Sequence, residues 1–242
     1  MSKRVKFFLG HLSVSLLVAL FAIGMVFFAW YPTPLAAALG VTSLFLILFF
    51  VDVVIGPLCS LLLYKEGKKG LKFDLSIIIL VQICAFGYGF YTIAQGRPAW
   101  IVLDALAFHI VKSSDIDPTY LAQAKPEFQQ PSWFKPQFAA LNVEQNVSQK
   151  NLLDKIPQGS TALNHPMYYM DVSAAKSRMQ LYAAPLARLE RYNDKKRVEH
   201  IAQQYPEANG WFGLVADQQD LVVLINKEQG KVIKIVDLRP WN

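Results

Sequence analysis

The stretch FFLGHLSVSLLVALFAIGMVFFAWYPTPLAAALGVTSLFLILFFV, residues 7 to 51, contains no Asp, Glu, Lys or Arg. It is too long for one membrane span, because about 20 residues cross the hydrocarbon core of a bilayer. The two prolines of YPTP, residues 31 to 34, mark a turn inside it, since proline ends helices. The stretch therefore predicts one membrane-spanning helix at about residues 8 to 30 and the start of a second at about residues 41 to 64.

A third apolar stretch predicts a further span at about residues 75 to 94. Aromatic rings favour the headgroup level of a bilayer. They lie at the predicted helix ends as Trp30, Tyr31, Tyr64 and Tyr91. We therefore expect residues 1 to 96 to form a three-helix transmembrane region that is surrounded by the lipid bilayer.

The charged residues gather in the rest of the chain. Residues 1 to 96 hold 7 of the 24 Lys and Arg residues and 3 of the 18 Asp and Glu residues, which leaves 17 and 15 for residues 97 to 242. That composition is ordinary for a globular domain, and its near balance of charge predicts no binding of nucleic acid. The two cysteines, Cys59 and Cys84, fall in the predicted spans, so the domain has none, as suits an exported domain without disulfides.

Basic residues flank the predicted spans unevenly. Three precede the first span and four lie between the second and third, whereas Arg97 alone follows the third. Short loops rich in Lys and Arg stay in the cytoplasm. We therefore expect the N-terminus to be cytoplasmic and residues 97 to 242 to form a domain on the opposite side of the membrane.

Asp52 is the only acidic residue within a predicted span, and it lies near the middle of that span. An aspartate there costs about 2.5 to 3.5 kcal/mol on insertion scales, so it needs a partner or a neutral state. Pro57, which follows Gly56, cannot donate to the carbonyl group of Val53 four residues earlier. The helix should therefore bend beside Asp52 and leave a polar notch there.

Depth along the helices indicates which residues could fill this notch. At a rise of about 1.5 Å per residue, Gln82 of the third span lies at the level of Asp52, and His11 of the first span lies at the level of Ser60. Two interpretations stay open. A hydrogen bond from Gln82 to Asp52 could hold the bundle together, or the notch of Asp52, Gly56, Pro57 and Gln82 could dock a polar or charged group on a partner's transmembrane helix.

The first part of the external domain mixes a strand pattern with short helices. Residues 100 to 111 are rich in strand-forming side chains, with Asp104 as a possible interruption. Six prolines between residues 113 and 171 exclude long helices, so we expect short ones at residues 118 to 123 and 135 to 147.

The second part predicts a helix and then a sheet. Asn193 or Asp194 can cap a helix that Pro206 ends. Three strands should follow, at residues 211 to 216, 221 to 226 and 232 to 238. The apolar run LVVLI, residues 221 to 225, should be the central one of the three. The predicted fold class is therefore three transmembrane α-helices followed by an α+β domain with a C-terminal antiparallel β-meander.

The sequence contains no recognised catalytic, phosphate-binding or metal-binding motif. None of the four histidines has another four residues away, so we predict no metal, no cofactor and no catalytic residue. Asp115 and Asp117 form a pair, but the sequence SSDIDP around them is typical of a turn. Asn146 begins a glycosylation sequon, a triplet that also arises by chance.

Four motifs together resemble a known family: VDVVIGP at residues 51 to 57, YKEGKKGLKFD at 64 to 74, YTIAQGRPAW at 91 to 100 and VDLRPW at 236 to 241. The chain is similar along nearly its whole length to the type IV pilin accessory proteins of the TfpX/TfpZ type. These are bacterial inner-membrane proteins. The segment at residues 103 to 109 departs from the family pattern, which has an Asp-Arg-aromatic arrangement there.

The resemblance implies a role in the assembly of type IV pili together with a cognate pilin, and with other pilus assembly proteins as further partners. It places the chain in the bacterial inner membrane with a periplasmic C-terminal domain, and it offers no catalytic residue. A pilin awaiting assembly has a hydrophobic helix in the bilayer and a head outside it. Our hypothesis is that the notch around Asp52 and Pro57 receives that helix while the external domain contacts the head.

Two other functions are compatible with the sequence. One is a membrane-tethered sensor whose external domain binds a ligand and acts through a lateral partner, because the cytoplasmic segments are too short for an output domain. The other is an enzyme that uses His109, Asp115 or Asp117, which would require these side chains to meet in one cleft.

Overall fold

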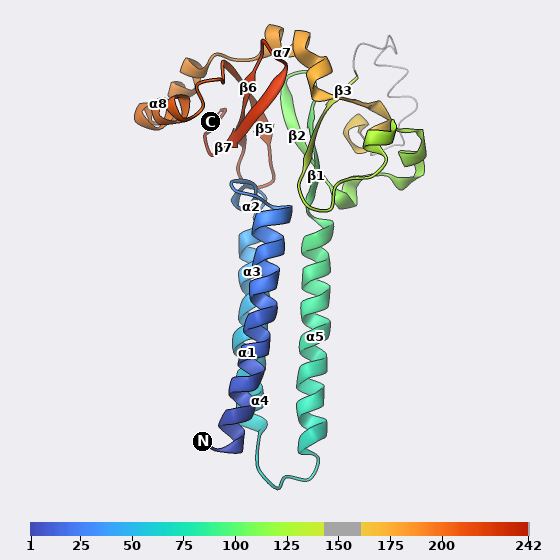
Figure 1. Cartoon of the computed structure of the whole chain (residues 1–242), viewed down its shortest axis with the longest axis vertical. Coiled ribbons are helices and arrows are strands. Elements are labelled where there is room, and N and C mark those ends of the chain that lie inside the picture. The colour runs from blue at the N-terminus through green and yellow to red at the C-terminus, as the bar shows by residue number, and fades with distance from the viewer. Residues whose placement is uncertain (143–160, 242) are drawn as a thin grey trace. The chain divides into compact units, whose positions relative to one another are not determined.

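Figure 1 shows a computed structural model of the chain, which describes residues 1 to 142 and 161 to 241. The chain forms two compact units. The first, which we call the bundle, comprises residues 1 to 36 and 40 to 96. The second, which we call the sheet domain, comprises residues 37 to 39 and 97 to 242.

The bundle is built from three long helical rods that are apolar and long enough to cross a membrane. The helical elements of residues 1 to 96 in chain order are α1 (Lys3–Ile23), the π-helical η1 (Gly24–Trp30), α2 (Leu35–Ala38), α3 (Val41–Phe49), the π-helical η2 (Phe50–Ile55), α4 (Gly56–Leu63) and α5 (Leu71–Gln95). The rods are Lys3–Trp30, Val41–Leu63 and Leu71–Gln95, so the three predicted spans are confirmed.

Local chemistry sets where these rods begin and how they pack. The Ser2 side chain caps α1, and Gly40 and Gly70 start the second and third rods with a left-handed backbone, φ 70° and 83°, that favours glycine. The Tyr31 hydroxyl donates to the carbonyl oxygen of Ile93 over 2.7 Å and so ties the end of the first rod to the third. Large apolar side chains cover the outer faces, as a lipid surrounding requires.

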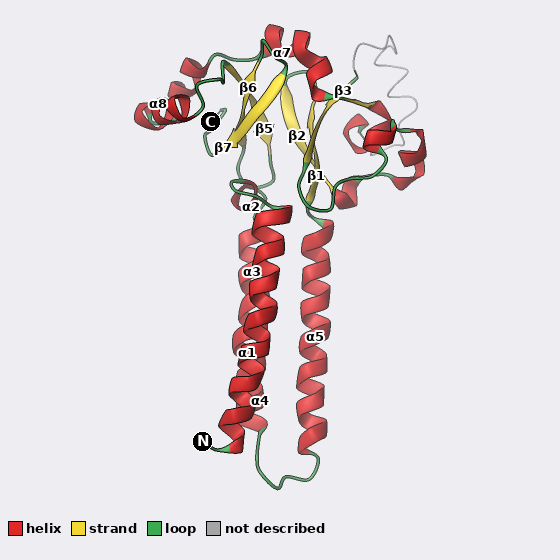
Figure 2. Ribbon diagram, viewed as in Figure 1, coloured by secondary structure: helices red, strands yellow, loops and turns green. Residues whose placement is uncertain are grey.

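The sheet domain contains a seven-stranded mixed sheet in the order β4-β3-β1-β2-β5-β6-β7. Figure 2 draws its strands in yellow. The strands are β1 (Pro98–Leu103), β2 (Ala107–Lys112), β3 (Gln137–Leu141), β4 (Tyr169–Met170), β5 (Gly210–Val215), β6 (Leu221–Asn226) and β7 (Lys231–Val236). The pairs β1–β3 and β2–β5 are parallel, and the other neighbours are antiparallel.

Short helices connect the strands. They are η3 (Ser113–Asp115), η4 (Pro118–Gln123), η5 (Pro126–Phe128), η6 (Ala162–Asn164), η7 (Pro166–Tyr168), η8 (Val172–Ala175), α7 (Lys176–Tyr182), η9 (Leu186–Arg191) and α8 (Lys195–Gln204). One core cluster packs Trp100 against Phe128 and Tyr169, and a second gathers Trp211, Leu224 and neighbouring apolar side chains.

The structure confirms the C-terminal meander, with β6 between β5 and β7, and the helix capped by Asp194. It also confirms the short helix at residues 118 to 123. The expected helix at residues 135 to 147 is wrong for its described part, because residues 137 to 141 form β3 in parallel pairing with β1. Residues 143 to 147, which include the sequon at Asn146, lie outside the described residues.

The strand pattern at residues 100 to 111 is interrupted at Asp104, and β1 and β2 pair there as a hairpin. The turn is made by Asp104, whose Oδ1 accepts hydrogen bonds from the backbone N–H groups of Leu106 and Ala107 over 2.8 and 3.0 Å. The guanidinium group of Arg178, which is largely buried, donates to the carbonyl oxygens of Asp104 and Leu141 over 3.0 and 2.8 Å. It thereby connects the ends of β1 and β3.

The motif VDLRPW closes the other side of the sheet domain. The Asn193 side chain accepts from the backbone N–H of Arg239 over 2.7 Å, and its amide donates to the Arg239 carbonyl over 2.8 Å. The indole N–H of Trp241 donates to Asp220 over 2.6 Å, and the ring fills the space where a Cβ on Gly213 would lie. This motif therefore fixes the chain end onto β5 and the β5–β6 turn.

The ion pairs of Asp237 predict how the stability of the sheet domain depends on pH. Partial burial would raise its pKa, but hydrogen bonds and charge attraction from Arg239 and Arg197 outweigh burial and hold the pKa below the ordinary value. A depressed pKa adds stability that is complete above the ordinary value and is lost as pH falls through the pKa of the folded state. Because the side chain is half exposed, we expect Asp237→Asn to cost about 1 kcal/mol or less at pH 7.

The measurement is the thermal unfolding of the sheet domain in the full chain, in detergent, at pH 7 and at pH 3. The difference between wild type and Asp237→Asn should shrink at the lower pH. Glu190→Gln, on an exposed position of η9, is the matched control and should change little at neutral pH. An undiminished difference between wild type and Asp237→Asn at pH 3 would contradict the assignment.

Candidate functional site in the bundle

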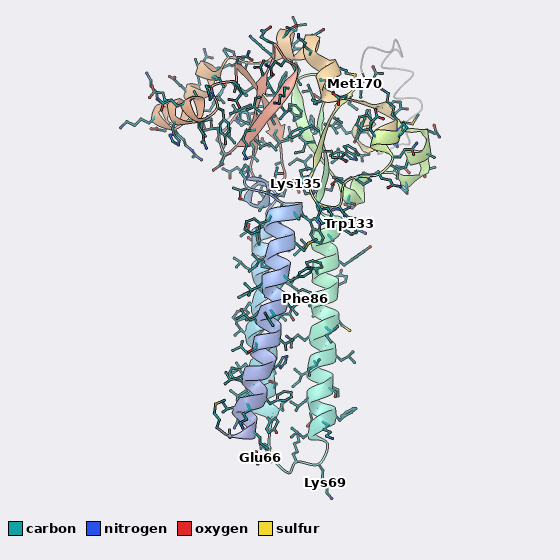
Figure 3. The ribbon with its side chains drawn as sticks, viewed as in Figure 1. Glu66, Lys69, Phe86, Trp133, Lys135 and Met170 are labelled. Atoms are coloured by element: carbon teal, nitrogen blue, oxygen red, sulfur yellow. The ribbon has the colours of Figure 1, made fainter. Side chains whose placement is uncertain are left out.

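A cavity of about 540 Å³ lies among α1, η2 and α5, and we call it the bundle groove. Its walls are apolar and are formed mainly by Phe7, Val14, Val18, Ile79, Ile83 and Phe86. Figure 3 shows the Phe86 side chain on α5. Val14 and Ile83 are 61% and 63% exposed, so the rim of the groove is open toward the lipid.

The floor of the groove is polar, and Gln82 is at its centre. The Gln82 amide nitrogen donates to the backbone carbonyl of Asp52 over 2.7 Å and to the Ser15 hydroxyl over 3.0 Å. Its amide oxygen lies 3.0 Å from Nε2 of His11, and Nδ1 of His11 lies 3.1 Å from the Ser60 hydroxyl. One side chain of α5 therefore connects all three rods.

The π-helical register of η2 explains why the Asp52 carbonyl group is available to Gln82. The Gly56 N–H donates to the carbonyl of Val51, five residues earlier. In the same register the next donor would be residue 57 and the next acceptor the carbonyl of Asp52, but Pro57 has no N–H. We expected proline to affect the carbonyl of Val53, and the π-helical register moves that effect by one residue to Asp52.

Gly56 is required at this point for a steric reason. A Cβ on residue 56 would lie 2.1 Å from the amide oxygen of Gln82 and 2.4 Å from its carbon. No real side chain tolerates such contacts, so the absence of a Cβ lets Gln82 approach the backbone of the second rod.

The Asp52 side chain lies in the wall of the groove and is only 5% exposed. Neither of its carboxylate oxygens makes a hydrogen bond of normal length and angle with the residues that the structure describes, although the Gln82 amide lies near the carboxyl group. The expected bond between Gln82 and Asp52 is present, but it reaches the backbone carbonyl. A buried carboxyl group is costly in a bilayer and is by default a candidate for function.

The structure thus brings together the four residues singled out from the sequence, Asp52, Gly56, Pro57 and Gln82. His11, which was expected at the level of Ser60, is in fact hydrogen-bonded to it. Sequence reasoning missed Ser15 and the contact from His11 to Gln82. Counting depth along the first span could have found both, since these side chains lie within about two turns of the level of Asp52.

The candidates in the sheet domain serve local structure. Nε2 of His109 lies 3.0 Å from Oδ2 of Asp104. Burial would raise the pKa of Asp104, but the His109 bond and two backbone N–H groups lower it below the ordinary value. Asp115 accepts from the backbone N–H of Lys112, and Asp117 caps η4 by accepting from Thr119. Across the described residues, no group of three or more His, Cys, Asp or Glu side chains could hold a metal ion.

The fold and the groove define a three-span membrane protein with a separate mixed-sheet domain. Residues 1 to 40 match the family model described as fimbrial assembly protein FimB. Two fimbrial assembly proteins of Dichelobacter nodosus, of serogroups I and E1, are each 33% identical over 180 residues, which cover 73% of this chain and 70% of the relative. A third, of serogroups C1 and C2, is 37% identical over 116 residues, which cover 47% of this chain and 88% of the relative.

This chain therefore belongs to the fimbrial assembly protein family. No solved structure matches it.

The geometry at Gly56 predicts the effect of adding one methyl group. Gly56→Ala should displace Gln82 and break its bonds to the other two rods, with a cost of about 1 to 2 kcal/mol. The matched control is Gly87→Ala on α5, because a Cβ there has no atom within 4 Å. Thermal unfolding of the full chain in detergent should show a lower melting temperature for Gly56→Ala alone, and equal melting temperatures would contradict the packing described here.

Proposed function

We propose that this protein is a non-enzymatic inner-membrane accessory protein for type IV pilin, of the TfpX/TfpZ type, which assists pilus assembly. Family membership supports a role in fimbria assembly. The four sequence motifs support the type IV system. In this proposal the bundle groove receives the transmembrane helix of the pilin, and the sheet domain contacts the pilin head.

The observation that carries the proposal is a groove in the bundle that opens toward lipid and contains an unpaired Asp52 carboxyl group. Helices in a bilayer associate by packing and by hydrogen bonds, because lipid tails are as apolar as leucine. Apolar walls with a polar floor offer a visiting helix both kinds of contact. A helper that acts before assembly needs such a surface inside the membrane.

The proposal also requires the sheet domain to be periplasmic. Seven Lys and Arg residues lie at the start of α1 and around the loop from α4 to α5, whereas Arg97 is the only one in the segment just after α5. Glu66 and Lys69 mark this loop in Figure 3. The positive-inside rule then places both basic segments in the cytoplasm.

The topology is tested by reporter fusions in a bacterial host. Alkaline phosphatase fused after Asn242 should be active, and the same enzyme inserted at Lys69 should be inactive, because it folds only outside the cytoplasm. The opposite pattern would remove the pilin head from the reach of the sheet domain and end the proposal.

Contact with pilin is tested by site-specific photocrosslinking in membranes of cells that express both proteins. A photoreactive residue in place of Ile83, on the rim of the groove, should give a pilin adduct. The matched control is Val81, which is 62% exposed on the same helix but does not line the groove. A third probe at Val215, at the end of β5, tests contact with the head.

Pilin adducts at Ile83 and Val215 but not at Val81 are the expected result. Adducts at Ile83 and Val81 in equal yield would mean that pilin has no preference for the groove. The absence of pilin at every position would favour the sensor function, in which the partner is another membrane protein.

A further inference from the structure

Most hydrogen-bonding groups of the described residues that line the bundle groove are paired within the bundle, but the Asp52 carboxylate oxygens are not. Both ends of the Gln82 amide and both ring nitrogens of His11 have partners within the bundle, and the Ser15 oxygen accepts from Gln82. Among the described residues that line the groove, the two carboxylate oxygens of Asp52 are the buried side-chain atoms without a partner. The Asp52 carboxylate oxygens therefore offer a visiting group a buried hydrogen-bond acceptor.

The depth of Asp52 defines where a matching group must lie. Asp52 is eleven residues from the end of its rod at Leu63, and Gln82 is eleven residues from the start of its rod at Leu71. At about 1.5 Å per residue, both lie about 16 Å from the cytoplasmic ends, which is the middle of a hydrocarbon core of about 30 Å.

We propose that the groove binds a transmembrane helix of another protein by accepting a hydrogen bond from a donor side chain at the middle of that helix. The donor belongs to the class of hydroxyl, amide, amine or neutral carboxyl groups. This inference rests on the proposed function and specifies which chemical feature of the pilin helix the groove recognises. The lipid chains that otherwise fill the groove carry no donor at this depth.

The length of the groove fits a helix. Its α1 wall runs from Phe7 to Val18, eleven residue steps along the helix, which is about 16 Å or three helical turns. A partner helix can therefore lie along the cytoplasmic half of the bundle with its donor at the deep end, opposite Asp52. A single small polar molecule would leave most of the apolar wall uncovered.

A second copy of this chain is a poor occupant. At the level of Asp52 the exposed positions of the described spans are mainly Leu16, Leu17, Val81 and Ile83, with Cys84 as the polar exception. A thiol is a weak donor. The nearby Ser13 hydroxyl already donates to the carbonyl of Leu9 over 2.8 Å. A donor from a different protein therefore fits the groove better than one from a second copy.

The test uses the full chain in membranes, with the photoreactive residue at Ile83 and pilin as the probed partner. Asp52→Ala removes the acceptor, and Asp52→Asn keeps one acceptor oxygen at nearly the same volume. We expect about a fivefold to tenfold lower pilin adduct and a matching loss of surface pili for Asp52→Ala, but a much smaller loss for Asp52→Asn. Both variants are compared at equal protein abundance.

A second experiment changes the pilin helix, and it tests the proposal even if the Asp52→Ala protein is not stable. Each polar residue of the pilin transmembrane helix is replaced by leucine in turn, with wild-type Asp52 opposite. One replacement should lower the adduct as Asp52→Ala does, and the two changes together should cost little more than either alone.

The outcomes separate this inference from the proposed function. Pilin adducts at Ile83 that survive both Asp52→Ala and every pilin replacement would overturn the donor proposal and leave the accessory function intact. Adducts with a second copy of this chain in place of pilin would overturn both. Equal losses for Asp52→Asn and Asp52→Ala would show that charge, and not an acceptor oxygen, is recognised, and would also overturn the proposal.

Discussion

The missing N–H of Pro57 is the constraint on which the rest of the bundle depends. In the π-helical register of η2 it leaves the carbonyl of Asp52 without a partner from its own helix. An unsatisfied carbonyl in hydrocarbon is expensive, so another rod must supply a donor. Gln82 does so, and Gly56 provides the space that lets it approach. The bonds from Gln82 toward Ser15 and His11 then bring the first rod into the same arrangement.

This hydrogen-bond arrangement does not offset the free-energy cost of placing the Asp52 carboxyl group in the membrane. The donors that stabilise the bundle go to the backbone of Asp52 and to Ser15, while the carboxyl group beside them has none. An intramembrane carboxyl costs about 2.5 to 3.5 kcal/mol, whereas a hydrogen bond between spans is worth about 0.6 to 2 kcal/mol. A leucine at residue 52 would spare the cost and leave the Gln82 bond to the backbone possible. Stability of the bundle alone therefore does not account for the aspartate, and this supports the proposed binding role.

The parts of the fold that the sequence predicted are those with a strong local pattern. Apolar runs of span length with at most one charged residue predicted the three rods, and β-branched or aromatic runs separated by turn residues predicted the meander of β5, β6 and β7. The prediction of a helix was wrong for residues 137 to 141. Their strand conformation comes from pairing with β1, and no local sequence pattern indicates that pairing. The depth count brought Asp52, Gly56 and Gln82 together, but the one-residue shift from Val53 to Asp52 needed the π-helical register, which depends on tertiary contacts.

The motifs that support the family resemblance divide into two physical roles. VDLRPW uses its polar groups within the sheet domain, where Asn193, Arg197 and Asp220 satisfy them, so its constraint is one of folding. VDVVIGP has the opposite role, because its polar groups are not all used within the bundle. In one stretch of helix, Pro57 lacks an N–H, Gly56 leaves room for Gln82, and the Asp52 carboxylate oxygens make no hydrogen bond of normal geometry with the described residues. A motif whose polar groups are all used internally explains how a domain keeps its shape. A motif that leaves a buried acceptor unused in a groove facing lipid supports the proposal that a partner helix is recognised at Asp52.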